Sequence, residues 1–187
     1  MEKLELDINE TTGKVTHLGD PLLLLNEGVL VFVQKEIEKA DEMLAKRTMY
    51  SVGEEFTKES VSHAQKLFAK TVGRLMKKDM IFSMMKLGME RGWGVIKPGP
   101  FIDYDTGEGQ IIVENSVIAR NYGKSSTPVC YALAGILAGA SEIIYGGNYF
   151  CEERACMAKG DPYCLFEFKK VSAEMKKVCM KSVGFLK

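Results

Sequence analysis

The sequence has few of the residues that catalysis and nucleic-acid binding usually need. Its two histidines, His17 and His63, lie near no Cys or Ser in a recognisable motif, so no pair of nucleophile and base is evident. Lysine plus arginine and aspartate plus glutamate both number 25, so no net charge attracts nucleic acid or an anionic membrane. We expect no catalytic residues and no nucleic-acid partner, and we favour a protein that is not an enzyme.

Long apolar runs are also missing. The longest, residues 22–25 and 29–33, are far shorter than the roughly 20 residues that cross a bilayer. The first residues do not follow the basic and then apolar layout of a signal peptide. Five cysteines are an odd number for a disulfide framework. We therefore expect a cytoplasmic protein with no membrane span, where a reducing environment favours metal binding by thiols over bridges.

Nucleotide-binding loops are absent as well. Gly123-Lys124-Ser125 ends like a phosphate-binding loop, but the glycine required five positions earlier is Ile118. The pair of glycines within residues 107–109 lacks the third glycine of a dinucleotide fingerprint. The sequence therefore offers no cofactor-binding residues.

What the chain does have is a balanced composition over 187 residues, 46% of them apolar. This length is typical of one domain, and such a chain hides about 70% of its surface in a core. We expect a single domain over residues 1–187, with an N-terminal hairpin (1–20), a central region (21–170) and a C-terminal helix (171–187) that covers a sheet edge or a partner.

Apolar periodicity and turn residues predict the elements. Helices are expected over residues 29–46, 54–77, 80–91, 128–145 and 171–182, and strands, besides a hairpin within 3–18, over 92–96, 101–104, 110–114, 149–157 and 163–169. This order predicts an α+β fold in which helices pack on one face of an antiparallel sheet.

Four residues in the last third have metal-ligating side chains, in the pattern C-x22-E-x2-C-x7-C. They are Cys130, Glu153, Cys156 and Cys164. Thiolates and carboxylates both bind zinc, and a structural site needs four protein ligands. Thr127 and Pro128 favour a helix start that places Cys130 in the first helical turn, where a thiol pKa falls. The alternative is that these are ordinary buried thiols and a surface glutamate.

The spacing within the hairpin sets a geometric condition on this site. Glu153 and Cys156 are three residues apart, so in an ideal strand their side chains point to opposite faces. If both bind one ion, we expect a bulge or an early strand end near Ala155.

A ligand pocket is the second candidate site. Methionines gather at positions 76, 80, 84, 85 and 89, either as flexible core filling or as the lining of an adaptable apolar pocket. The single tryptophan lies between two glycines, either in the core or against a cavity. Small residues in 128–145 allow close helix packing or leave room for a ligand. The candidate pocket residues are Met84, Trp93, Phe101, Ala140 and Cys151.

The combination of Cys130, a small-residue helix and the segment E-x-x-C-x-A-x-G-D-P-x-C-x-F-E-F resembles the 4-vinyl reductase domain family, also described as predicted hydrocarbon-binding domains. The resemblance is close over residues 130–168 and looser over 29–121. It implies a structural zinc held by Cys130, Glu153, Cys156 and Cys164, a position for Cys151 in the pocket wall, and a homodimer. It also implies a fold similar to subunits of vesicle-tethering complexes and to gas-sensing haem domains.

The leading functional hypothesis is a zinc-containing module that binds a small hydrocarbon or aromatic molecule, as a sensor or carrier. The central region (21–170) would be its ligand-binding domain. One alternative is a reductase acting on a vinyl group of a tetrapyrrole, since the family is named for that role. A second is a scaffold or adaptor protein. No polar pocket groups that would hold a phenolic hydroxyl can be placed, which favours a more apolar ligand or a different one.

Overall fold

The computed structural model describes residues 6–17, 20–71 and 77–182. The elements in chain order are β1 (Asp7–Asn9), β2 (Lys14–His17), β3 (Asp20–Leu22), α1 (Val29–Glu38), α2 (Glu42–Thr71), α3 (Lys77–Glu90), β4 (Val95–Asp103), β5 (Glu108–Glu114), α4 (Val117–Tyr122), α5 (Tyr131–Tyr145), β6 (Asn148–Ala155), the 3-10 turn η1 (Met157–Lys159), β7 (Cys164–Val171) and α6 (Ala173–Ser182).

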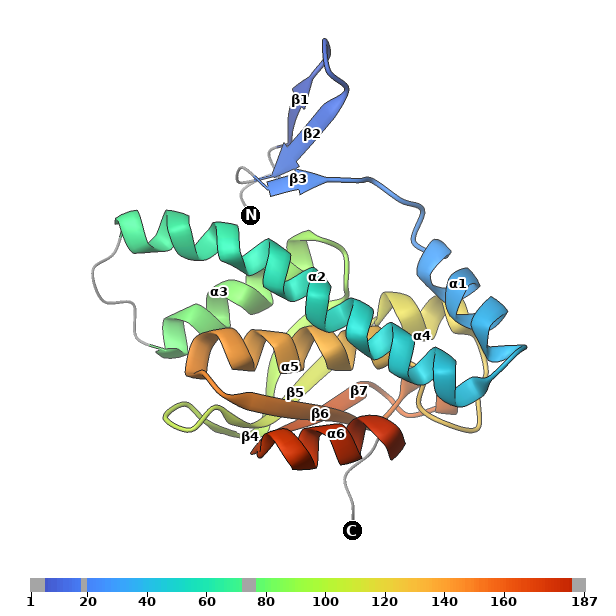
Figure 1. Cartoon of the computed structure of the whole chain (residues 1–187). Coiled ribbons are helices and arrows are strands. Elements are labelled where there is room, and N and C mark those ends of the chain that lie inside the picture. The colour runs from blue at the N-terminus through green and yellow to red at the C-terminus, as the bar shows by residue number, and fades with distance from the viewer. Residues whose placement is uncertain (1–5, 18–19, 72–76, 183–187) are drawn as a thin grey trace.

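The larger of two sheets organises the molecule. Its strands run in the order β4-β5-β7-β6, and every neighbouring pair is antiparallel. Ile111 and Val113 of β5 are buried beside Phe166 of β7, whereas the alternate residues are only half-buried, as the two-residue period of a strand requires. Figure 1 shows α5 lying along this sheet and α2 crossing α5. The predicted α+β class is confirmed.

The helices α2 and α5 meet through glycines. A Cβ atom on Gly53 of α2 would lie 2.0 Å from the carbonyl oxygen of Ala132 on α5. A Cβ atom on Gly135 of α5 would lie 2.0 Å from the carbonyl oxygen of Tyr50 on α2. The two backbones therefore touch without intervening side chains, which is the close packing that the small residues of 128–145 suggested.

Two predicted helix boundaries are wrong. The helix expected over 29–46 is two helices, because the Asp41 side chain accepts the backbone N–H of Leu44 (2.9 Å) and starts α2 anew. The helix expected from residue 54 begins at Glu42, since Gly53 serves the contact with α5 and does not end the helix. Residues 72–76, with Met76 of the methionine group, lie outside the described residues. No helix in the described ranges is both long and apolar enough to cross a membrane.

The N-terminal hairpin is confirmed by β1 and β2, and a third strand, β3, extends it into a small sheet. Residues 3–5 and 18 of the predicted hairpin lie outside the described residues. Figure 1 shows this small sheet apart from the large one, on the far side of the helices. The strands expected over 92–96 and 101–104 form one strand, β4, whose register shifts between Pro98 and Ile102.

Helix α6 lies against β6, the edge strand of the large sheet. The ammonium group of Lys176 on α6 reaches Glu54 of α2 (2.5 Å) and Glu142 of α5 (2.6 Å). Both carboxylates and the ammonium are largely buried, so this cluster ties the C-terminal helix to the helical layer.

Candidate metal centre and apolar cavity

Four metal-ligating side chains meet where α5, β6 and β7 come together. One potential ligand atom from each lies within 4.8 Å of those of the other three, and all four residues are buried. The cluster could therefore hold a metal ion. Its members are Cys130, Glu153, Cys156 and Cys164, the four residues that the sequence pattern singled out.

Cys130 reaches the cluster from the N-cap of α5. The predicted helix start at Pro128 is wrong by three residues, because α5 begins at Tyr131 and Cys130 has non-helical backbone angles (φ −87°, ψ 46°). The carbonyl of Val129 accepts the side-chain amide of Gln34 on α1 (3.2 Å), a contact that engages the segment before the helix. The thiol thus lies at the helix mouth and not within its first turn.

The bulge required by the spacing of Glu153 and Cys156 is found. The register of β6 against β7 shifts between Glu153 and Ala155, so the strand gains one residue there. Strand β6 ends at Ala155, and Cys156 then leads into η1 and the turn at Gly160, which has the positive φ of 97° that glycine tolerates. The irregularity turns Cys156 toward the same side as Glu153.

Hydrogen bonds already hold the cluster in shape. One carboxylate oxygen of Glu153, Oε2, accepts the backbone N–H of Cys130 (2.8 Å), while the buried Oε1 has no hydrogen-bond partner. The Cys164 sulfur accepts the backbone N–H of Met157 (3.4 Å). A buried oxygen without a partner is costly, and a cation would satisfy it.

The spacing of the sulfurs fits a tetrahedral ion. The Sγ atoms of Cys130 and Cys164 are 3.8 Å apart. Zinc–sulfur bonds of about 2.3 Å in a tetrahedron separate two sulfurs by about 3.8 Å. Three sulfurs and one carboxylate oxygen also make up the four protein ligands of a closed structural site.

The electrostatics of the cluster also favour a cation. Burial, followed by the charge of Cys156, raises the pKa of the Glu153 carboxyl to about 8. Burial raises the pKa of the Cys130 thiol well above its ordinary value, while hydrogen bonds from Cys130 and Cys164 lower the pKa of Cys156. Four acidic groups this close cannot all ionise by themselves, and a divalent cation removes that conflict.

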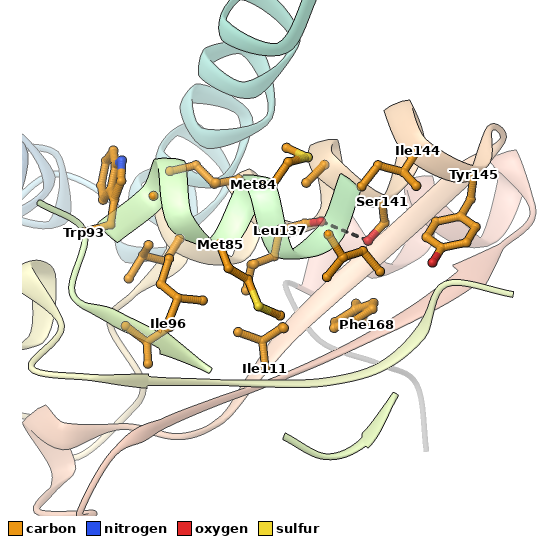
Figure 2. A pocket seen from close by; sticks show the side chains of 16 residues that line it. Met84, Met85, Trp93, Ile96, Ile111, Leu137, Ser141, Ile144, Tyr145 and Phe168 are labelled. Atoms are coloured by element: carbon orange, nitrogen blue, oxygen red, sulfur yellow. Dashed lines mark hydrogen bonds between the residues drawn. The ribbon is translucent and has the colours of Figure 1, made fainter. Parts of the chain in front are cut away.

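A second feature is an apolar cavity of about 70 Å³ between α3, α5 and the large sheet (Figure 2). Figure 2 shows Trp93 at one end, Tyr145 at the other, and Met85 between helix and sheet. The residues that line it are Ile81, Met84, Met85, Gly88, Trp93, Ile96, Ile111, Val113, Leu133, Ile136, Leu137, Ala140, Ser141, Ile144, Tyr145 and Phe168.

The cavity offers few hydrogen-bonding groups to a ligand. Apart from the indole of Trp93, two lining side chains are polar, and both already have partners. The Ser141 hydroxyl donates to the carbonyl of Leu137 (3.0 Å), drawn as a dashed line in Figure 2. The Tyr145 hydroxyl donates to the carbonyl of Tyr104 (2.9 Å). The chemistry of the lining therefore suits an apolar molecule.

Three of the five candidate pocket residues, Met84, Trp93 and Ala140, line this cavity. Phe101 does not line it, because it lies on the outer strand β4 with 58% of its surface exposed. Cys151 does not line it either. It is buried in β6, where its backbone N–H donates to the hydroxyl of Tyr50 (2.9 Å).

Sequence reasoning missed most of the cavity lining, for example Leu137, Tyr145 and Phe168. These residues come from α5 and β7, and nothing in an apolar periodicity distinguishes a cavity wall from ordinary core. The one available signal was the run of small residues on α5, which pointed to Ala140.

The structure thus defines a class: an α+β domain that combines a buried three-cysteine, one-glutamate cluster with an enclosed apolar cavity. Residues 110–170, which contain the whole cluster, match the family model of the 4-vinyl reductase domain. This match confirms the resemblance that the sequence pattern indicated.

Two relatives are uncharacterized proteins of Methanocaldococcus jannaschii. MJ0855 is 40% identical over 62 residues, a match that covers 32% of this chain and 27% of that protein. MJ1460 is 27% identical over 178 residues, a match that covers 91% of this chain and 95% of that protein. This chain therefore corresponds to about a quarter of the first relative and to nearly the full length of the second.

Two solved structures share the fold. The phenol-responsive sensory domain of the transcription activator PoxR, solved with phenol, superposes with a TM-score of 0.75 at 18% identity, covering 94% of this chain and 91% of that one. A trafficking protein particle complex subunit 3 from Naegleria fowleri, covalently bound to palmitic acid, gives a TM-score of 0.55 at 14% identity, covering 79% and 97%. At these identities the likeness concerns the fold.

Proposed function

We propose that this protein is a binding module for a small apolar molecule, which it senses or carries. The observation that carries the proposal is the enclosed cavity under α3, whose serine and tyrosine hydroxyls are already bonded within the protein. The fold shared with the PoxR sensory domain supports it, since that domain was solved with phenol. Unlike phenol, the preferred ligand here is a hydrocarbon or an aromatic ring with little polarity.

Methionine makes the cavity adaptable. At about 70 Å³ it is smaller than the cavities of about 150 Å³ that hold benzene, so a ligand must displace side chains. Met84 and Met85 line it from α3, and unbranched thioether side chains change shape at low cost. Ligand binding should therefore shift α3 relative to α5, which gives a sensor a conformational output.

Toluene titration tests this function. Ala140→Leu should fill the cavity and weaken toluene binding by at least about tenfold, because a side chain then occupies the ligand's space. Ala173→Leu, the same change at an exposed position of α6, is the control and should leave affinity unchanged. Calorimetry provides the dissociation constants. Equal toluene affinity in both variants, or no binding by the native protein, would refute the proposal.

The metal in this proposal is one structural zinc ion per chain, bound by Cys130, Glu153, Cys156 and Cys164. The free Oε1 of Glu153 and the 3.8 Å sulfur separation support it. Four protein ligands would leave no position for a reactive water, so the ion would fasten the β6–β7 hairpin to the mouth of α5. Thiolate ligation fits the reducing cytoplasm expected from the sequence.

Metal analysis of protein purified without added metal tests this assignment. We expect close to one zinc per chain, and loss of that zinc in Glu153→Ala. Glu152→Ala changes the neighbouring residue, which is not a member of the cluster, and should keep the metal. Zinc that persists in the Glu153 variant would show that the fourth ligand is a different group.

We also propose that the module is a homodimer, as the family resemblance implies. Ile8 of β1 and Phe32 of α1 are 57% and 64% exposed, and apolar side chains this exposed often lie at subunit contacts. Light scattering coupled to gel filtration would give the mass. A monomer at micromolar concentration would contradict this part of the proposal.

A further inference from the structure

A groove of about 420 Å³ lies on the other side of the helical layer from the large sheet. Its floor includes Val52 and Phe56 of α2, and its outer lip is formed by the leucines at positions 23–25, which follow β3. These leucines are between 59% and 81% exposed, so the lip is apolar and open to solvent. Neither the sequence pattern nor the comparisons assign anything to this groove.

The groove and the inner cavity share a wall. Trp93 and Ile136 line both of them. The Trp93 ring meets the ring of Phe56 edge to face, with centroids 5.5 Å apart at 73°, and Phe56 faces the groove. Trp93 is also the residue at one end of the cavity in Figure 2. Displacement of two side chains would therefore join the two hollows.

The two hollows differ in chemistry. The serine and tyrosine hydroxyls of the cavity are bonded within the protein, whereas the groove contains His17, which is 4% exposed and whose Nδ1 has no hydrogen-bond partner. The guanidinium of Arg91 also lines the groove, above the ring of Phe56 at 5.8 Å. A buried nitrogen without a partner costs free energy unless a bound group satisfies it.

The two hollows also differ in size. Ligand sites for small molecules usually measure about 300 to 1,000 Å³, a range that the groove reaches and the cavity does not. The cavity by itself accepts at most a small ring, and only after side chains move. An elongated molecule would need both hollows.

We propose that the groove and the cavity are two halves of one site for an elongated amphiphile, whose hydrogen-bonding head, a hydroxyl or a carboxylate, lies against His17 while its apolar chain passes Trp93 and Ile136 into the cavity. This inference rests on the proposed function and specifies its ligand. Trp93 then separates the empty halves and packs along the chain of the bound amphiphile. The groove is the entrance through which the cavity fills.

The test uses 1-decanol, decanoate and toluene as probes of the native protein. Trp93 is the only tryptophan, so its fluorescence reports on the shared wall without labelling. Decanol or decanoate should change this emission and bind more tightly than toluene. The stronger of the two long probes identifies the head group as hydroxyl or carboxylate.

Two groove variants locate the binding site. Val52→Phe narrows the groove from a position that is 43% exposed, and Val178→Phe makes the same change at 40% exposure on α6 as its control. His17→Phe removes the hydrogen-bonding partner but keeps an aromatic ring. We expect Val52→Phe and His17→Phe to raise the dissociation constant of the stronger long probe by about tenfold and that of toluene by less than about twofold.

The outcomes separate this inference from the proposed function. If toluene binds natively but Val52→Phe leaves the long probes unaffected, the inference fails while the cavity function stands. If no probe binds the native protein, both fail. If Val52→Phe instead converts a dimer into a monomer and the long probes do not bind, the groove is a subunit contact and the inference is overturned. Because Val52 is half-exposed, its variant remains informative even if His17→Phe does not fold.

Discussion

Helix α5 carries a different kind of site at each end. At its N-terminus, Cys130 belongs to a cluster whose four members are fixed by hydrogen bonds and by a strand bulge. Toward its C-terminus, Ala140 and Tyr145 line a cavity shaped by apolar contacts alone. The first site is defined by which residues are present, and the second by the space they leave. Mutations should therefore affect the cluster in an all-or-none way and the cavity gradually.

The largest expected effect comes from breaking the cluster. Cys164→Ser should abolish metal binding and lower the free energy of unfolding by at least about 5 kcal/mol, because structural zinc contributes about 10 to 16 kcal/mol of binding energy that is available to folding. For a chain of this size, such a loss lowers the melting temperature by at least about 10 °C. Calorimetry and metal analysis of one preparation would measure both.

The matched control is Cys151→Ser, since Cys151 is an equally buried thiol outside the cluster. It should keep the metal and lose less than about 2 kcal/mol. If the two variants lost the same stability with the same metal content, the cluster would be no more than a group of buried thiols.

The next effect would disturb both ends of α5 together. Gly135→Ala introduces a Cβ atom 2.0 Å from the carbonyl oxygen of Tyr50, so α2 and α5 must separate. We expect a loss of about 3 kcal/mol, although alanine has the higher helix propensity by about 1 kcal/mol. Metal content and toluene affinity should fall in parallel. Denaturant unfolding would measure the stability change.

Gly139→Ala is the control on the same helix. Its Cβ atom would lie 3.1 Å from the carbonyl oxygen of Glu54, a contact that a small shift relieves. The stability change should stay within about 1 kcal/mol of zero. Equal losses at positions 135 and 139 would mean that the close contact does not determine the helix separation.

A smaller effect should spare both sites. Lys176→Met removes the cation between Glu54 and Glu142 and should cost about 2 kcal/mol at pH 7, less than a fully buried pair because these groups keep some exposure. Metal and toluene binding should be retained. Lys177→Met, at the exposed neighbouring position, is the control and should change stability by less than about 0.5 kcal/mol.

The pH dependence of this variant has a definite sign. Burial raises the pKa of Glu54, so the folded protein binds this proton more tightly than the unfolded chain and gains stability as pH falls through the raised pKa. The hydrogen bonds to Glu142 and Glu54 outweigh burial and raise the pKa of Lys176, whose contribution is complete below about 10.5 and is lost as pH rises through the raised value. The loss in Lys176→Met should thus shrink between pH 7 and pH 5. Urea titrations at both values would show a constant loss if the carboxylates were not the cause.

The smallest expected effect is in the cavity. Ser141→Ala removes a hydroxyl that bonds to the carbonyl of Leu137, so stability should fall by less than about 1 kcal/mol and toluene affinity should change by less than about twofold. Phenol provides the sharper comparison. A loss of phenol affinity of tenfold in this variant would show that the hydroxyl serves a ligand and that the cavity is not purely apolar.

The same contrast explains what could be predicted from the sequence. Cys130, Glu153, Cys156 and Cys164 were found because ligand chemistry and spacing are written in the residue types, and even the irregularity near Ala155 followed from strand geometry. The α+β class followed from periodicity. The cavity was found in part, because its shape depends on how five elements pack.

Tertiary contacts also moved the helix boundaries. Gly53 and Gly135 looked like weak points in a helix, yet each serves backbone contact between α2 and α5. The start of α5 shifted from Pro128 to Tyr131, in a segment whose Val129 carbonyl bonds to Gln34 on a distant helix. Short elements such as β3 and α4 have too few residues for a periodic signal, so they were not predicted.

Both margins of the large sheet are closed to further strands. On one side, α6 lies along β6, and the Tyr50 hydroxyl accepts the backbone N–H of Cys151. On the other, β4 contains Pro98 and Pro100, which have no N–H, together with a register shift. A sheet protected in this way resists edge-to-edge aggregation and strand exchange between molecules. The protein can therefore keep an apolar interior accessible to small molecules without recruiting other chains into fibrils.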